Sequence, residues 1–198
     1  MKEYLIVISG ASGSVYGLRL VERLLSGGAG VTVVATKAGR EVMAFETGFT
    51  LPESGAVEAL LRFLGLPTSL PLRVVEPSDL FDRVASGSNA PDAMIVCPAS
   101  MGFVAAVAAG MAADLPERAA DVMLKECRPL VLVPRETPLS LIHLRNLTAV
   151  TEAGAVVVPA MPAFYTKPAS LDDMVNFVVG KVLDVLGVEH ELYRRWGA

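Results

Sequence analysis

A series of short apolar runs, recurring between segments of helical periodicity, limits the possible folds of this chain most strongly. The runs are residues 4–8, 31–35, 93–97, 130–133 and 155–158. None of them alternates apolar with polar residues, and such runs are typical of strands that are buried on both faces of a parallel sheet. The sequence therefore predicts a sheet covered by helices on each side.

The segments between the runs predict those helices. Residues 15–25 place four leucine and valine side chains on one face, and residues 139–152 follow a proline and stop before Gly154. Residues 172–186 follow the N-cap candidate Ser170 and stop at Gly187. Alternation of strand and helix indicates a three-layer α/β domain, a Rossmann-like fold of flavodoxin type with a parallel sheet. Residues 51–72, with three prolines and a short helical centre at 57–64, are expected to leave the sheet.

Composition narrows the class of protein further. The 198 residues are 53% hydrophobic and 19% charged, with a net charge of −4, and the mean hydropathy is +0.50. This composition excludes disorder and predicts a large core or a buried subunit interface. The acidic balance disfavours nucleic acid as a partner. We expect a single domain over residues 1–198.

One uncharged stretch, residues 93–113, has about the length that spans a bilayer. It contains Pro98, Ser100 and two glycines, so we interpret it as a buried strand, a loop and a buried helix rather than a membrane span. Residues 1–8 lack the pattern of a signal peptide, which predicts a cytoplasmic protein.

The cysteines and histidines predict neither a disulfide framework nor a metal site. The chain has only Cys97 and Cys127, and the two histidines, His143 and His190, do not combine with them into a zinc spacing. We expect free and mostly buried thiols.

Small, hydroxylic or charged residues follow every apolar run. They occupy residues 9–14, 36–37, 98–102, 134–137 and 159–165. Because ligands bind at the carboxyl ends of the strands in open parallel sheets, this pattern predicts one site at that edge.

The Gly-Ala-Ser-Gly turn at residues 10–13 is either a phosphate cradle or a tight turn without a ligand. It matches neither the dinucleotide fingerprint nor a P-loop, and no acidic residue closes the second run, where Thr36 and Lys37 stand instead. A mononucleotide is therefore favoured over NAD. Residues 85–89 form a second hydroxylic stretch or a plain loop.

Several charged residues are further candidates. Arg118 and Lys125 are seven residues apart and share one helix face, which suits a phosphate or an ordinary solvated face. Arg135 and Glu136 directly follow an apolar run, where unused charges would be costly. Glu46 is either a proton-handling carboxylate with a raised pKa or a helix-end acid.

Together these stretches resemble the flavin prenyltransferase (UbiX) family, formerly described as aromatic acid decarboxylases, within the flavoprotein decarboxylase-like superfamily. The resemblance covers nearly the whole chain, and its most specific part is residues 117–138; the other parts are residues 8–13, 46–47, 85–88, 97–100, 162–165 and 195–197. It implies metal-independent transfer of a dimethylallyl group from dimethylallyl monophosphate to N5 and C6 of reduced FMN. It also implies a dodecamer with sites at subunit interfaces, a place in ubiquinone biosynthesis, and a UbiD-type decarboxylase that receives the prenylated FMN.

The resemblance assigns roles to particular residues. It implies proton handling by Ser12 and Glu46, with Glu136 and Lys125 near the donor. It implies that the C-terminal tail, residues 187–198, packs near the site. The residues implied for FMN are Gly10, Ala11, Ser12, Thr36, Ser100, Met101, Gly102, Phe103 and Arg135, and those implied for the donor are Tyr165, Lys181, Lys125, Arg118, Ser86 and Ser88.

Two positions depart from the family pattern. The family usually has Arg where this chain has Lys181, so the charge is kept but bidentate geometry is lost. Leu80 and Phe81 stand in a stretch where members can carry Trp, which predicts a changed aromatic wall beside the prenyl group.

Two other functions remain as alternatives. A flavin-dependent cysteine decarboxylase of the same fold would need a catalytic His near Glu46 and an Asn where Met101 and Gly102 stand. A non-catalytic FMN carrier would need the flavin site but not the cations of the donor pocket, so the presence of Lys125 and Lys181 argues against it.

Overall fold

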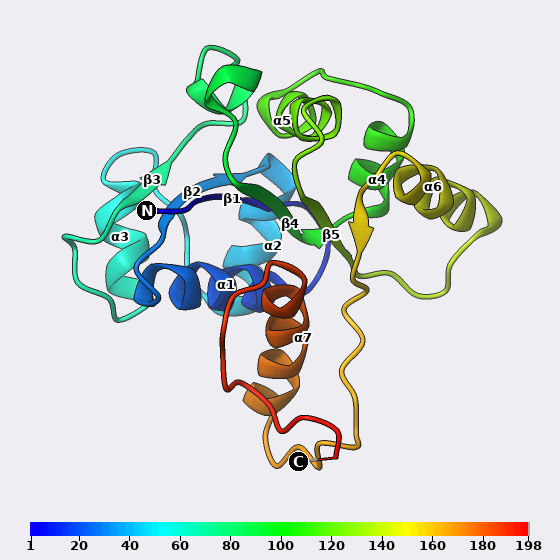
Figure 1. Ribbon diagram of the computed structural model, residues 1–198. Helices are drawn as coiled ribbons and strands as arrows, with labels where there is room; N and C mark the ends of the chain where they lie inside the picture. The colour runs from blue at the N-terminus through cyan, green and yellow to red at the C-terminus, as the bar shows by residue number, and fades with distance from the viewer. Residues whose placement is uncertain (198) are drawn as a thin grey trace.

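The computed structural model describes residues 1–197, and these form an α/β fold around one six-stranded parallel sheet (Figure 1). The strand order is β3-β2-β1-β4-β5-β6, and every neighbouring pair is parallel. The strands are β1 (Glu3–Ile8), β2 (Gly30–Ala35), β3 (Leu72–Val74), β4 (Ala93–Ala99), β5 (Leu130–Pro134) and β6 (Val156–Val157).

Helices cover both faces of this sheet. They are α1 (Ser14–Ser26), α2 (Lys37–Thr47), α3 (Ala56–Phe63), α4 (Met101–Ala108), α5 (Leu115–Lys125), α6 (Leu141–Glu152) and α7 (Leu171–Val185). Two short 3-10 helices, η1 (Arg83–Ala85) and η2 (Gly87–Asn89), precede β4. Figure 1 shows α1 and α7 on one side of the sheet and α5 on the other.

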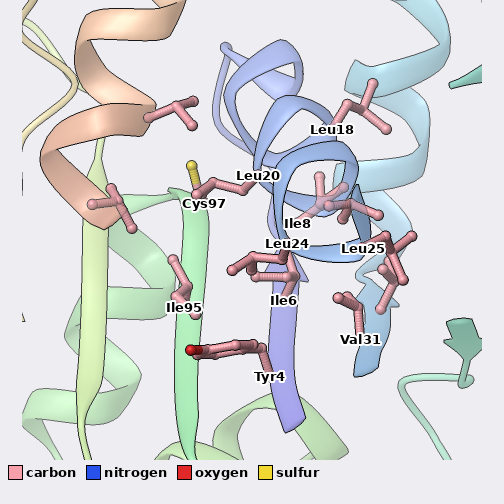
Figure 2. Close-up of a cluster of buried hydrophobic side chains, with 14 of the residues drawn as sticks. Tyr4, Ile6, Ile8, Leu18, Leu20, Leu24, Leu25, Val31, Ile95 and Cys97 are labelled. Carbon is pink, nitrogen blue, oxygen red and sulfur yellow. The ribbon is translucent and has the colours of Figure 1, made fainter. Parts of the chain in front are cut away.

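Strand β1 shows why its sequence lacks polar alternation. Ile6 and Ile8 join the core cluster that contains α1 and α7, whereas Leu5 and Val7 join the cluster that contains α4 and α5. Successive side chains of a strand point to opposite faces, so a strand between two helical layers needs apolar residues at every position. Figure 2 shows the first cluster, where Leu20 and Leu24 of α1 lie against the sheet.

The predicted fold class is confirmed, as are the strands at residues 4–8, 31–35, 93–97 and 130–133, within two residues at each end. Ser170 caps α7 through a capping box, and Gly187 follows that helix with a φ of +64°. Of the uncharged stretch 93–113, residues 93–99 form β4 and residues 101–108 form α4, separated by Ser100 alone. Within residues 1–197, no helix is both long and apolar enough to cross a membrane.

Other predictions fail at the edges of the sheet. The sequence did not indicate β3, whose three residues begin at the last residue of the excursion at 51–72. The fifth run forms only the two-residue β6, because it is an edge strand with Val156 exposed. Both cysteines are free, but Cys127 is exposed, so the prediction of a buried thiol is correct for Cys97 alone.

The single-domain boundary at 1–198 stays a prediction, and Ala198 lies outside the described residues.

Candidate active site at the carboxyl edge of the sheet

Three small residues, Ser9, Gly10 and Gly17, allow close contacts between the segment around the turn after β1 and the neighbouring elements. The buried Ser9 hydroxyl donates to the Pro98 carbonyl oxygen at 2.8 Å and accepts from the Ser100 backbone N–H at 2.7 Å. A Cβ at Gly10 would lie 2.6 Å from Ala38 Cβ, and a Cβ at Gly17 would lie 2.2 Å from the Cys97 carbonyl oxygen. The ends of β1 and β4 and the start of α1 are therefore fixed relative to one another.

Glu46, near the end of α2, caps the N-terminus of α1. Its carboxylate accepts hydrogen bonds from the backbone N–H of Gly13, at 3.0 and 3.1 Å, and of Ser14, at 3.0 Å. Gly13 is the N-cap residue, and no side chain of its own caps the helix. A carboxylate is stabilised at a helix N-terminus, so Glu46 occupies the position that the sequence predicted for a phosphate.

The pKa of Glu46 corrects one of the two predictions for this residue. Burial raises the pKa of the carboxyl group, but hydrogen bonds from Ser12 and from the backbone of Gly13 and Ser14 outweigh burial, and the net pKa is lowered. The hypothesis of a raised pKa is therefore wrong. Glu46 does end its own helix, as the other hypothesis held, and its function in the fold is to cap a second helix.

Two other predicted residues cap helices at the same edge. The Thr36 hydroxyl accepts from the Gly39 N–H at 3.0 Å at the start of α2, and the Ser100 hydroxyl accepts from the Phe103 N–H at 3.2 Å at the start of α4. Two helix N-termini thus flank the turn after β1, which favours an anionic ligand between them.

Predicted residues around α4 differ in what they can offer a ligand. The side chains of Met101 and Phe103 belong to the core, so only the backbone groups of these residues can contact a ligand. Gly102 is exposed, and a Cβ there would have only Ser100 Oγ, at 4.0 Å, within reach. A planar ligand can therefore approach this backbone closely.

Arg135 closes the site from the end of β5. Its Nε donates to the Ser12 carbonyl oxygen at 3.2 Å. Arg135, Ser12 and Glu46 line one hollow of about 400 Å³, together with Gly13, Val15, Tyr16, Thr47 and Ala160. The Arg135 guanidinium and the Glu46 carboxylate therefore both lie near Ser12 at the carboxyl edge of the sheet.

Tyr16 is a residue of this hollow that sequence reasoning missed. Its ring would lie 2.8 Å from a Cβ at Gly13, so it lies close against the turn. Burial raises the pKa of the Tyr16 hydroxyl, and the nearby Cys97 and Glu46 add to this while Arg135 opposes it. The sequence did contain a signal for Tyr16: it is an aromatic residue in the first turn of the helix that follows the glycine turn.

A second group of predicted residues lies on the segment before α7, on α7 itself and on the C-terminal tail. Tyr165 makes edge-to-face contacts with Trp196, at 5.0 Å between ring centroids, and with Phe177, at 5.8 Å. Lys181 Nζ lies 3.5 Å from an Asp184 carboxylate oxygen. A hollow of about 560 Å³ is lined by Tyr165, Thr166, Lys167, Arg194, Arg195, Trp196 and Gly197.

A third group lies on α5 and the 3-10 helices. Arg118 Nε donates to the Ala85 carbonyl oxygen at 3.2 Å, the hydroxyl oxygens of Ser86 and Ser88 are 3.0 Å apart, and Lys125 pairs with Glu126. Glu126 in turn lies against Gly87, where a Cβ would be 2.0 Å from its Oε1.

The C-terminal end of α5, with Lys125, is at the opposite edge of the sheet. Arg128, which follows α5, donates to the carbonyl oxygens of Ala90 and Pro91, just before β4 begins. Strands of this length separate that edge from Arg135 by roughly 15–20 Å. One copy of the chain therefore does not bring Lys125 together with Ser12 and Glu46.

Glu136 is exposed, and its carboxylate accepts from the Thr137 N–H at 3.0 Å. Within residues 1–197, no group of three or more His, Cys, Asp and Glu side chains is arranged to hold a metal ion. Burial raises the pKa of the Cys97 thiol, so this cysteine stays protonated in the core.

Comparison with known proteins identifies a family, a relative and two similar solved structures. Residues 1–183 match the model of the family described as Flavoprotein. The chain is 46% identical over 193 residues to the flavin prenyltransferase UbiX of Pseudomonas aeruginosa, covering 97% of this chain and 92% of that protein. Among solved structures, it is similar to a dodecameric FMN-dependent UbiX-like decarboxylase from Escherichia coli O157:H7, with a TM-score of 0.87, 38% identity and coverage of 99% and 100%.

A second solved structure, of AnUbiX (PadA1) in complex with FMN and dimethylallyl pyrophosphate, has a TM-score of 0.89 and 36% identity, with coverage of 100% of this chain and 98% of that one.

Proposed function

Because the chain belongs to the Flavoprotein family and, within it, to the flavin prenyltransferases called UbiX, we propose that it transfers a dimethylallyl group from dimethylallyl monophosphate to reduced FMN. The observation that carries this proposal is the ionised Glu46 carboxylate, held by the backbone of Gly13 and Ser14 beside Ser12 and Arg135. Glu46 is a base and Arg135 a cation, and both line one hollow at the edge where α/β sheets bind their ligands.

The residues at this edge fit FMN. Two helix N-termini, capped by Thr36 and Ser100, offer backbone donors to an anionic ligand, and Gly102 leaves room for a flat ring. The proposed FMN residues are Gly10, Ala11, Ser12, Thr36, Ser100, Met101, Gly102, Phe103 and Arg135. When bound, reduced FMN supplies the nucleophilic atoms N5 and C6 that accept the prenyl group.

Ring closure at C6 adds a proton to the double bond of the prenyl group and removes one from C6, and we assign the movement of these protons to Ser12 and Glu46. Glu46 is ionised at neutral pH because its pKa is lowered, so it can accept a proton without first losing one. A lowered pKa also makes Glu46 a weak base. Such a base suits passing the proton on through the Ser12 hydroxyl better than holding it. The departing inorganic phosphate is a stronger base than this carboxylate, so it is the better final acceptor.

The donor phosphate needs cations, because ionisation of an allylic phosphate places negative charge on the leaving group. Tyr165 and Lys181 lie on one side of the fold, whereas Lys125, with Ser86 and Ser88, lies toward the amino edge of the sheet. Arg118 is two turns before Lys125 on the same helix. We therefore propose that a neighbouring copy of the chain supplies Arg118 and Lys125, with Glu136 close to the donor.

Exposed apolar side chains support assembly into such an oligomer. Phe45 is 92% exposed and Phe81 is fully exposed, which is costly for isolated copies and typical of surfaces that are covered by a partner. The UbiX-like structure from Escherichia coli is described as dodecameric, and we propose the same state here. We further propose that the C-terminal tail helps to close the site, and that the product serves a UbiD-type decarboxylase in the cytoplasm, in ubiquinone biosynthesis.

The test is anaerobic incubation of the purified protein with reduced FMN and dimethylallyl monophosphate, followed by mass and absorbance analysis of the flavin. We expect the flavin to gain one C5 unit, and this gain to be lost in Glu46→Gln. The matched control is Glu41→Gln, an exposed glutamate on the same helix, which is expected to keep the activity. Tightly bound FMN that stays unmodified with either the mono- or the diphosphate donor would refute the transferase and leave an FMN carrier.

A further inference from the structure

The carboxylate of Asp184, in the last turn of α7, gathers four side chains. Oδ1 lies 3.1 Å from His190 Nε2 and accepts from the Arg195 guanidinium at 2.9 Å. The Tyr193 hydroxyl donates to Oδ2, and Lys181 Nζ lies 3.5 Å from the same oxygen. Three of these four partners come from the C-terminal tail, so a single carboxylate joins the tail to the helix.

The tail also fits the surface of α7 at one glycine. A Cβ at Gly180 would lie 2.6 Å from the Tyr193 ring and 2.8 Å from His190 Cε1, so both rings lie where only glycine leaves room. The Leu192 backbone N–H donates to His190 Nδ1 at 3.2 Å. Because Nδ1 accepts this bond, the proton of the neutral ring is on Nε2, which donates it to Asp184.

Ring contacts continue from the anchored tail to Tyr165. The Tyr193 ring packs against Phe177 at 5.0 Å between centroids, and Phe177 contacts Tyr165 at 5.8 Å. Trp196, one residue beyond Arg195, makes its own edge-to-face contact with Tyr165 at 5.0 Å. The tail therefore contacts Tyr165 along two routes, and both begin at groups that Asp184 holds.

Lys181 benefits from an orienting partner for a chemical reason. An ammonium group on a flexible four-carbon stem has no preferred direction of its own, in contrast to the planar guanidinium of arginine. A single exposed ion pair orients such a group weakly. Here the carboxylate is itself fixed by hydrogen bonds from His190, Tyr193 and Arg195, so the ion pair gives Lys181 a defined position.

We propose that Asp184 is a positioning residue for the prenyl donor, which fastens the tail over Tyr165 and holds Lys181 in place for the donor phosphate. This inference rests on the proposed function, which assigns Tyr165 and Lys181 to that phosphate. Asp184 acts through these residues and does not touch the donor itself. Burial raises the pKa of its carboxyl group, but hydrogen bonds from Tyr193, Arg195 and His190 outweigh burial and lower the pKa to about 2, so the carboxylate stays ionised at neutral pH.

The experiment compares Asp184→Asn with wild type in the FMN-loaded protein. Calorimetric titration with dimethylallyl monophosphate gives the donor Kd. Hydrogen exchange of the Leu192 backbone N–H, which donates to His190 Nδ1, reports whether the tail is docked. We expect the Kd for the donor to rise about tenfold and the Leu192 N–H to exchange faster, while the Kd for FMN and kcat at saturating donor change less than threefold.

Two further variants make the comparison specific. Asp172→Asn is the matched control, because Asp172 lies on the same helix and pairs with Arg19, 2.9 Å away, rather than with the tail; both measurements should equal those of wild type. Tyr193→Phe keeps the ring and removes only the hydroxyl donor to Asp184, so a rise of about threefold in the donor Kd is expected. If Asp184→Asn does not fold, Tyr193→Phe replaces it in both measurements.

The inference is overturned if Asp184→Asn or, where that variant does not fold, Tyr193→Phe lowers the melting temperature but leaves the donor Kd within 1.5-fold of wild type, since the tail is then only structural. Wild-type protein that does not bind the donor also overturns it. If wild type binds the donor but forms no prenylated flavin, the proposed function fails, while the ratio of donor Kd values still decides the role of Asp184.

Discussion

Removing the cap that Glu46 provides for α1 should destabilise the protein by an amount that depends on pH. The carboxylate accepts from two backbone N–H groups at the first turn of α1. Glu46→Gln keeps one carbonyl acceptor and loses the charge, whereas Glu46→Ala loses both. The two variants therefore separate the electrostatic part of the cap from its hydrogen bonds.

The magnitude follows from general values for caps and helix dipoles. A negative charge at a helix N-terminus contributes about 0.3–1 kcal/mol, and we take about 0.5 kcal/mol for Glu46→Gln because the carboxylate is exposed and screened. Loss of the whole cap costs about 0.5–2 kcal/mol, so about 1.5 kcal/mol is expected for Glu46→Ala. For a chain of this size, these values correspond to decreases in melting temperature of about 1–2 °C and 3–6 °C.

The sign of the pH dependence follows from the lowered pKa. A carboxyl group whose pKa in the folded state is below its ordinary value of 4.5 stabilises the fold fully above about pH 4.5. This contribution is lost as the pH falls through the lower folded pKa. The stability gap between wild type and Glu46→Gln should therefore be constant near neutral pH and shrink in acid.

The assay is scanning calorimetry of the FMN-free protein at one scan rate, at pH 7 and at several values below pH 4.5. Glu41→Gln and Glu41→Ala, on the same helix as Glu46, serve as controls. The reasoning is refuted if Glu46→Ala is as stable as Glu41→Ala at pH 7, or if the gap between wild type and Glu46→Gln widens as the pH falls.

Three further predictions concern other parts of the fold. Gly17→Ala places a Cβ where the Cys97 carbonyl oxygen is 2.2 Å away, so urea unfolding should show a loss of about 2–3 kcal/mol; a loss below 0.5 kcal/mol contradicts this. Gly102→Ala fills open space on α4 and should stabilise the FMN-free protein by about 0.5–1 kcal/mol. If the flavin lies on this backbone, the same change should weaken FMN binding about tenfold in a fluorescence titration. Unchanged affinity for FMN argues against that placement. Lys125→Ala and Lys181→Ala should each be inactive, but co-expressed copies should recover about a quarter of wild-type activity, because random mixing leaves that share of two-copy sites intact; no recovery contradicts a shared site.

The order of strands and helices could be read from the sequence because burial on both faces of the sheet leaves a local signal. Leu5 and Ile6 are both fully buried, on opposite faces of β1, and the uninterrupted apolar run reflects this. Edge strands leave a weaker signal, since they need few apolar residues. For that reason β3 was missed and the length of β6 was overestimated.

The candidate residues could be found by sequence, but their arrangement could not. Ser12, Glu46 and Arg135 are far apart in the chain, and the meeting of strand ends brings them to one hollow. The family resemblance implies that Lys125 joins the site, at a subunit interface. Within one copy of the chain Lys125 does not reach the hollow, because α5 runs antiparallel to the strands and carries Lys125 to the amino edge of the sheet.

The sequence by itself determined the fold class and the edge at which the site lies, because apolar periodicity and turn residues act over short stretches of chain. Only the tertiary structure decided which groups surround the carboxylates of Glu46 and Asp184, and how far Lys125 lies from the hollow within one copy of the chain. A pKa depends on which donors surround a carboxylate, and those donors come from distant segments: the N-terminus of α1 for Glu46 and the C-terminal tail for Asp184. Contacts of this kind leave no periodic signal in the chain, so they appear only when the elements are packed together.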